Sequence, residues 1–251
     1  MNRMARLAIG YHDELAEQVD WLLARDGTDA PALRASAVAH LGQEGLAILG
    51  RFDRVAELPD VAGSIDPADS RTRFWQAYAT GFAGLATGET SGLNDAVDLA
   101  NREGDTTAIL AATSMLALVS VWTGRLAVTN VALTRMKATL RSLDQPLKGD
   151  TGGPGHGAAI YYAVWSGRIA EAREYIQPQL PRNALMAFVS GLAIAWTGFV
   201  TDDREIGDIA QRWTNRPAPS LVSGSPSIVA LLTAKEGVSG SLCVRDPPSR
   251  S

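Results

Sequence analysis

Apolar residues along this chain recur at the spacing of an α-helix and only rarely alternate with polar ones. Met115, Leu118 and Val119, for example, are separated by three and four positions, which places them on one helical face. A β-strand would alternate with a period of two. Frequent Ala, Leu, Arg and Glu also favour helix formation. The pattern therefore predicts an all-α protein.

Glycine and proline interrupt this helical pattern at short intervals. Both residues are strong punctuators of secondary structure. The turn signals stand at Asp26-Gly27, Pro59, Gly63, Asp66-Pro67, Gly88, Gly104-Asp105, Gly124, Lys148 to Gly157, Gly167, Pro178, Pro181, Gly198 and Pro217. Helices of ordinary length fit between these signals, so the sequence predicts consecutive helices joined by short turns.

An internal repeat becomes visible when five of the glycines are aligned. They follow helical stretches at intervals of 31 to 43 residues, and they are Gly50, Gly88, Gly124, Gly167 and Gly198. The last three end Trp-[Thr/Ser]-Gly triplets that begin at Trp122, Trp165 and Trp196. A period of this length is typical of repeats that consist of two helices.

Each element of the triplet has a physical role in such a repeat. Glycine adopts the left-handed backbone that ends a helix at little cost. A tryptophan two positions earlier can bury a large apolar surface against the neighbouring helix pair. We therefore expect turns at the five glycines, and Trp122, Trp165 and Trp196 in equivalent, mostly buried positions.

The segment from Trp165 to Tyr175 resembles the signature of the tetratricopeptide repeat family. Gly167-Arg168-Ile169 is similar to the family's turn, and Ala172 matches the small residue at which paired helices cross. Seven positions before the turn glycine the family has another small residue. Gly81, Ala117 and Gly191 match there, whereas Gln43 and Ile160 do not, and Val55, Leu93, Thr129 and Asp203 depart from the small residue after the turn. The resemblance spans about residues 35 to 215 and implies a solenoid of antiparallel helix pairs.

Irregular repeats in a chain rich in Arg and Ala also resemble the middle region of large ATP-dependent transcription regulators of the MalT and LuxR type. Members of that class carry an ATP-binding domain before the repeats and a helix-turn-helix domain after them. This sequence has neither a Gly-x4-Gly-Lys-[Ser/Thr] loop nor a recognisable C-terminal DNA-reading helix pair. The resemblance therefore implies a detached or truncated sensor region within a transcription-regulatory system.

The sequence changes character near its C-terminus. Residues 1–217 carry the helical pattern and are predicted to form one helical-repeat domain. Residues 218–251 accumulate Ser, Gly and Pro, and we expect a mostly disordered tail with one short helix at Ser227 to Lys235.

Charge and cysteine content narrow the choice of partners and compartment. A net charge of -4 gives no electrostatic support for nucleic-acid binding. The single Cys243 excludes an intrachain disulfide framework, so a reducing, cytoplasmic location is expected. Three uncharged segments, from Thr106, Thr151 and Asn183, are interrupted by hydroxyl residues or glycines. They are interpreted as buried helices of a soluble protein and not as membrane spans.

The residues that most often carry chemistry form no motif here. None of the three histidines, His12, His40 and His156, has a metal-ligand neighbour at a suitable spacing. The glycine-rich stretch Gly149 to Gly157 could present backbone N–H groups to a phosphate, but an inter-repeat linker that leads into a helix near Ala158 is favoured. Asp202-Asp203 and Asp95 with Asp98 are interpreted as helix caps or solvated faces. The prediction is that the chain has no catalytic residue, no metal site and no cofactor.

An aromatic stripe is the best candidate for a binding surface. In a tetratricopeptide repeat the first helix of each pair lines the concave side, and counting back from Gly88 places Trp75, Tyr78 and Phe82 there on one face. Equivalent counts give Tyr161 and Phe188. Such a stripe is also what a helix core looks like, so exposure decides between the two interpretations.

These observations favour a non-enzymatic interaction or effector-sensing module. Its groove would hold a protein or peptide partner, or a small apolar effector. The alternatives are a purely structural scaffold and an all-helical enzyme with a pocket between repeats. Converging carboxylates or a histidine in a closed cavity would favour the enzyme, whereas an open apolar groove would favour the module.

Overall fold

The computed structural model describes residues 31–39, 52–84, 89–148, 152–176 and 184–214. Every regular element in these ranges is helical, and none of them contains a strand, so the predicted all-α class is confirmed. No helix in the same ranges is long and apolar enough to cross a membrane. The predicted tail from residue 218, the domain boundary before it, and the turns at Gly50 and Gly88 lie outside the described residues.

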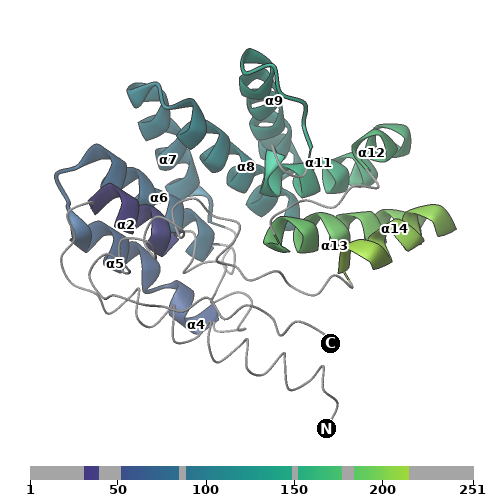
Figure 1. The fold of residues 1–251 in the computed structure, drawn as a ribbon, viewed down its shortest axis with the longest axis horizontal. Coiled ribbons are helices and arrows are strands. Elements are labelled where there is room, and N and C mark those ends of the chain that lie inside the picture. The colour runs from purple at the N-terminus through teal and green to yellow at the C-terminus, as the bar shows by residue number, and fades with distance from the viewer. Residues whose placement is uncertain (1–30, 40–51, 85–88, 149–151, 177–183, 215–251) are drawn as a thin grey trace, which may run out of the picture.

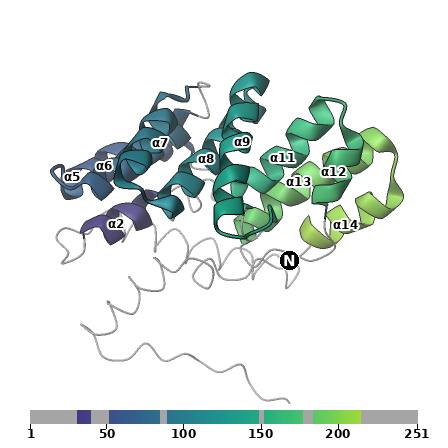
Figure 2. The same cartoon turned by 90° about the horizontal axis from the view of Figure 1, so that it is seen from above.

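The helices follow one another along the long axis of the molecule (Figures 1 and 2). They are α2 (Pro31–Ala37), α4 (Phe52–Val55), α5 (Leu58–Ile65), α6 (Ser70–Ala83), α7 (Ser91–Glu103), α8 (Thr106–Trp122), α9 (Leu126–Ser142), α11 (Pro154–Trp165), α12 (Ile169–Tyr175), α13 (Ala184–Thr201) and α14 (Arg204–Thr214).

Consecutive helices pack in pairs. α6 packs on α7, α8 on α9, α11 on α12, and α13 on α14. The last three pairs are joined by turns of two or three residues, so their helices run antiparallel. The first members of the pairs also pack on one another, since α8 contacts α11 and α11 contacts α13. At the other end, α2 and α5 cover α6.

Several helix ends are formed by aspartate caps and by glycines that the sequence marks as turns. Asp69 and Asp105 precede α6 and α8, and their carboxylates accept the N–H groups of Thr72 and Ala108. Gly124 and Gly167 end α8 and α11 with φ values of 74° and 72°. These two predicted turns are confirmed, and the left-handed backbone explains why glycine stands there.

The predicted turn at Gly198 is wrong, because Gly198 lies inside α13. The helix continues for about one more turn to Thr201, and Asp202 supplies the left-handed residue with φ of 50°. Gly198 instead permits a close approach of α14, since a Cβ there would lie 3.1 Å from the backbone nitrogen of Gly207. A glycine at a helix crossing and a glycine at a helix end look alike in sequence.

The predicted start of the helix that follows the glycine-rich stretch is also wrong. Helix α11 begins at Pro154, about one turn before the expected start at Ala158. Gly155 is buried, and a Cβ there would come within 3.0 Å of the Ser114 side chain and also strike Met136. This end of the stretch is therefore a packing site in which small residues admit α8 and α9. Residues 149–151 lie outside the described ranges.

The prediction that three tryptophans are mostly buried between helix pairs is wrong. Trp122, Trp165 and Trp196 are 40–43% exposed. Trp122 and Trp165 are the last residues of α8 and α11, where neighbouring helices no longer cover both faces of a ring. Small and aliphatic residues fill the space between pairs, among them Ala117, Val119, Ala159, Ile160 and Ile194.

Candidate functional site

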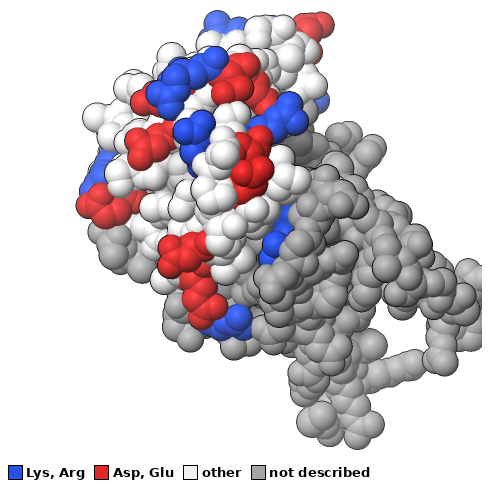
Figure 3. Space-filling model, turned by 90° about the vertical axis from the view of Figure 1, so that its left-hand side faces the viewer, with Lys and Arg blue, Asp and Glu red and all other residues white. Residues whose placement is uncertain are grey.

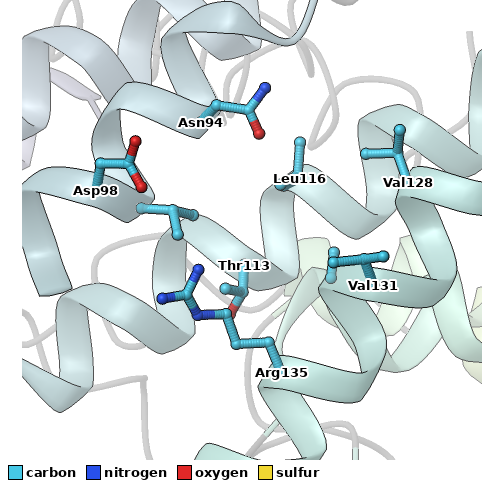
Figure 4. A pocket seen from close by; sticks show the side chains of 9 residues that line it. Asn94, Asp98, Thr113, Leu116, Val128, Val131 and Arg135 are labelled. Carbon is cyan, nitrogen blue, oxygen red and sulfur yellow. The ribbon is translucent and has the colours of Figure 1, made fainter.

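A pocket of about 320 Å³ lies between α7, α8 and α9 (Figure 4). Residues spaced by three and four positions on each helix point toward it, so three regular helices are sufficient to build it. The lining residues are Asn94, Val97 and Asp98 of α7, Thr113 and Leu116 of α8, and Val128, Val131, Ala132 and Arg135 of α9. Its volume is at the lower end of the range for small-ligand sites.

The interior of the pocket is fixed by the protein core. Val97, Leu116 and Ala132 are buried and belong to the main hydrophobic cluster, which extends from α2 to α11. Thr113 is buried as well, and its hydroxyl donates to the carbonyl of Ile109 at 2.6 Å. That hydroxyl can therefore accept a hydrogen bond from a ligand, while its own proton stays within α8.

The mouth of the pocket carries both polar and apolar groups. Asn94, Asp98 and Arg135 are exposed, and Val131 is 68% exposed. In the view of Figure 4 Asp98 and Arg135 lie on one side, opposite Val128 and Val131, and Asn94 stands above them near Leu116. Neither Asp98 nor Arg135 forms an ion pair within the described ranges, so both charged groups remain available to a ligand.

One interaction links the walls of the pocket at the N-terminal ends of α7 and α9. Arg125, which precedes α9, donates to the hydroxyl of Thr90, which precedes α7, at 3.2 Å. Thr90 is buried. The bond joins residues 35 positions apart and supports a preformed pocket.

The predicted aromatic stripe does not form an open groove. Tyr78 and Phe82 are 2% and 9% exposed and belong to the main core cluster, and Trp75 is half-buried against it. The rings of Trp75 and Tyr78 pack edge to face with centroids 5.5 Å apart. α2 and α5 pack against α6. The resemblance to a tetratricopeptide repeat does not predict these additional neighbours. Tyr78 and Phe82 are therefore core residues, and their assignment as a contact patch is wrong.

The other two predicted binding residues lie elsewhere. Tyr161 of α11 is half-buried between the two larger core clusters, and its ring lies 5.6 Å from that of Trp165. Burial raises the pKa of the Tyr161 hydroxyl. Residue 188 falls within α13, but the side chain of Phe188 lies outside the described set.

His156 is the most deeply buried ionisable residue among those described. It is fully buried on α11, and its two ring nitrogens lie 2.9 Å from the Ser190 hydroxyl of α13 and 2.9 Å from the carbonyl of Tyr175. Desolvation lowers its pKa, with partial opposition from the hydrogen bond to Tyr175. The pocket does not include His156, and both nitrogens are engaged. The arrangement is a structural link between α11, the end of α12 and α13.

A second polar cluster joins α9 to α12. Lys137 contacts the carboxylate of Glu171 at 3.3 Å and donates to the hydroxyl of Tyr175 at 2.6 Å. That hydroxyl in turn donates to Glu171 at 2.8 Å, and Arg168 pairs with the same carboxylate. Burial raises the pKa of Glu171, but the bond from Tyr175 and the charges of Lys137 and Arg168 together outweigh it, so the pKa is lowered.

Charges elsewhere give little support for other kinds of site. On the side seen in Figure 3, basic and acidic side chains are interspersed among uncharged ones and form no extended basic patch. Within the described ranges no cluster of three or more His, Cys, Asp or Glu residues could hold a metal ion. Asp203 accepts N–H groups at the start of α14 and pairs with Arg173, as the cap interpretation predicts.

No protein-family model, curated protein sequence or solved structure matches this chain. The geometry of the chain itself is therefore the basis for any functional proposal.

The pocket could have been found only in part from the sequence. Val128, Val131 and Arg135 show the spacing of one helical face, and Asp98 is exposed, in agreement with a solvated face as one of its two interpretations. What the pattern does not reveal is that α7 and α9 lie on either side of α8 with a space between them, because this depends on side-chain volumes at the helix crossings.

Proposed function

We propose that this chain is a non-enzymatic helical-repeat module that binds an apolar group of a peptide partner or a small apolar effector in the pocket between α7, α8 and α9. The observation that carries the proposal is the composition of this pocket. A buried aliphatic interior opens to the surface beside an exposed valine, and an amide, a carboxylate and a guanidinium stand at the mouth.

This arrangement suits recognition of an apolar body with polar ends. A branched aliphatic side chain can displace water from Val97, Leu116 and Val128, which is the main favourable contribution to such binding. Asn94 can donate to and accept from a peptide group, while Asp98 and Arg135 offer complementary partners for a cation and an anion. Polar groups at the rim determine orientation more than affinity.

The paired arrangement of the helices supports the repeat interpretation. Two Gly turns with left-handed backbone, at Gly124 and Gly167, separate helices of two successive pairs. We extend the proposal to a tetratricopeptide-like solenoid and, on the sequence resemblance alone, to a sensor region of a transcription-regulatory system in the cytoplasm. The neighbourhood of the coding sequence tests this last step, which predicts an adjoining ATPase or helix-turn-helix reading frame.

A peptide-display selection on the full chain tests the binding proposal. We expect selected peptides to share a Leu, Ile or Val anchor. Val131→Asp adds a charge at the exposed rim, so it should abolish binding of a selected peptide in calorimetry without unfolding the chain. Asn130→Asp adds the same charge to the opposite, exposed face of α9 and should leave binding unchanged. Equal affinity of both variants would show that the peptide binds elsewhere.

A further inference from the structure

Helix α13 exposes an apolar face that no other part of the described fold uses. Phe199 is 79% exposed, and Leu192, Trp196 and Val200 are between 37% and 49% exposed. Ala195 is exposed beside them. The positions repeat at intervals of three and four residues, so they form one continuous strip along the helix. The rings of Trp196 and Phe199 lie 5.8 Å apart within this strip.

The opposite face of α13 is already occupied. Ser190 and Ile194 are buried there, and Gly198 admits the backbone of α14. Contacts with α11 and α14 account for this buried side. The strip from Leu192 to Val200 is thus a second apolar face on the same helix. Single exposed apolar residues are common on protein surfaces, whereas a continuous apolar strip is typical of an interaction site.

The packing of the preceding helices indicates what covers such a face. α11 packs on α8, and α13 packs on α11, so each of these helices receives another helix. α13 stands next in this series, and no helix of the described ranges covers its strip. The partner that fits is consequently a helix with an apolar face at the same spacing.

α13 itself has those properties. None of its 18 residues is charged, so two copies of the helix can approach without like-charge repulsion. In an antiparallel pair related by a two-fold axis near Trp196, Leu192 of one copy faces Val200 of the other. The strip is therefore complementary to itself, as an isologous interface requires. We propose that two copies of this chain associate through the strip formed by Leu192, Ala195, Trp196, Phe199 and Val200.

The size of the strip sets the expected affinity. A Phe or Trp side chain can bury about 150–250 Å² in all, and only the exposed part, 43% of Trp196 and 79% of Phe199 in each copy, is left for the interface. With the aliphatic residues of both copies the interface buries about 1,000 Å² or less, which is typical of weak, reversible complexes, so we expect a dissociation constant of order micromolar or weaker. Association should therefore depend on concentration.

Sedimentation velocity of the full chain over a range of concentrations tests the proposal. The mass should rise from that of one chain to twice that value. Leu192→Glu and Phe199→Glu each place a carboxylate in the apolar contact, so each should raise the midpoint of association at least about tenfold. Leu143→Glu makes the same change at an exposed leucine after α9 and should leave the midpoint unchanged. Thermal unfolding followed by circular dichroism verifies that each variant is folded.

A spin label provides a second measurement that does not depend on the charge variants. With Cys243 replaced by Ser, a nitroxide on Ala195→Cys should show dipolar broadening at high concentration, because the axis passes close to this position. The same label on Ala127→Cys, an exposed position of α9, should not. A single-chain mass at every concentration would overturn the proposal, as would association that Leu192→Glu leaves intact or broadening confined to position 127. A single-chain mass would point to another segment or another protein as the occupant.

Discussion

The Nδ1 atom of His156 lies 2.9 Å from the hydroxyl oxygen of Ser190, in the interior between α11 and α13. Because the carbonyl of Tyr175 can only accept, the Nε2 atom of the same ring carries a proton and donates to it. In the neutral ring Nδ1 is then the acceptor, and the Ser190 hydroxyl is the donor. One neutral tautomer thus satisfies every polar atom of a fully buried ring.

This arrangement predicts that the stability of the fold depends on pH. Burial holds the pKa of His156 below its ordinary value of 6.5. The unfolded chain therefore binds a proton at a higher pH than the folded chain does. The stabilising effect of the neutral ring is fully present above pH 6.5 and is lost as the pH falls toward the lowered folded pKa. The melting temperature should fall as the pH is lowered from 7.5 to 5, and His156→Gln should reduce the slope of melting temperature against pH. An unchanged slope would contradict the assignment.

Removing the hydroxyl of Ser190 should destabilise the fold at neutral pH. Ser190→Ala leaves Nδ1 of His156 without its donor in a buried site. An unsatisfied buried acceptor costs about 1–3 kcal/mol. The measurement is the free energy of unfolding from urea denaturation at pH 7.5. Ser64→Ala is a suitable control, since Ser64 donates within an exposed turn and its loss should cost much less. Equal losses in both variants would indicate that the buried bond adds little.

The sequence was most informative where a local rule determines the structure. The 3.6-residue period and the turns at Gly104-Asp105, Gly124 and Gly167 all follow from local backbone chemistry. Gly198 misled because a glycine that ends a helix and one that admits a neighbouring helix share the same surroundings in sequence.

The errors about side chains have a related origin. Counting from a turn predicts Tyr78 and Phe82 in a groove, whereas both are buried in the core, on a helix on which α2, α5 and α7 pack. Trp122 and Trp165 were expected to fill the space between pairs, yet they stand at helix ends. Burial depends on which helices lie beside a residue, and this is a property of the whole chain. Whether α7, α8 and α9 leave a pocket between them depends in the same way on how the helices pack.

A close approach of α6 and α7 predicts which glycines tolerate a methyl group. A Cβ on Gly81 would lie 2.7 Å from the backbone nitrogen of Leu93 and would also strike the Leu93 side chain. Gly81→Ala must therefore push the helices apart, and overpacking of this kind costs about 1–3 kcal/mol. Gly207→Ala is the matched control, because nothing lies near its Cβ position and its backbone is helical. Alanine there should be neutral or stabilise the fold by up to about 1 kcal/mol. Chemical denaturation of both variants measures the difference, and a stabilising Gly81→Ala would refute the close approach.

The cluster around Glu171 predicts a measurable but modest coupling between α9 and α12. Lys137 and Glu171 are partly exposed, and their side chains are 3.3 Å apart, so water and salt screen their attraction. Pairs of this kind contribute about 0.2–1 kcal/mol. The hydroxyl of Tyr175 bonds to both groups, and its removal should weaken the coupling. A double-mutant cycle of Lys137→Met and Glu171→Gln, repeated in Tyr175→Phe, measures this coupling as a difference in unfolding free energy.

The coupling should depend on pH and on salt. Because the folded pKa of Glu171 is lowered, the contribution of its carboxylate to the stability of the fold is present above its ordinary value of 4.5 and is lost as the pH falls through the folded pKa. The coupling should also shrink in high salt, whereas Arg54→Met should leave it unchanged, since Arg54 pairs with Glu57 beside α4. A coupling that persists in high salt after loss of the Tyr175 hydroxyl would show that aliphatic packing of the Lys137 stem, and not its charge, joins the two helices.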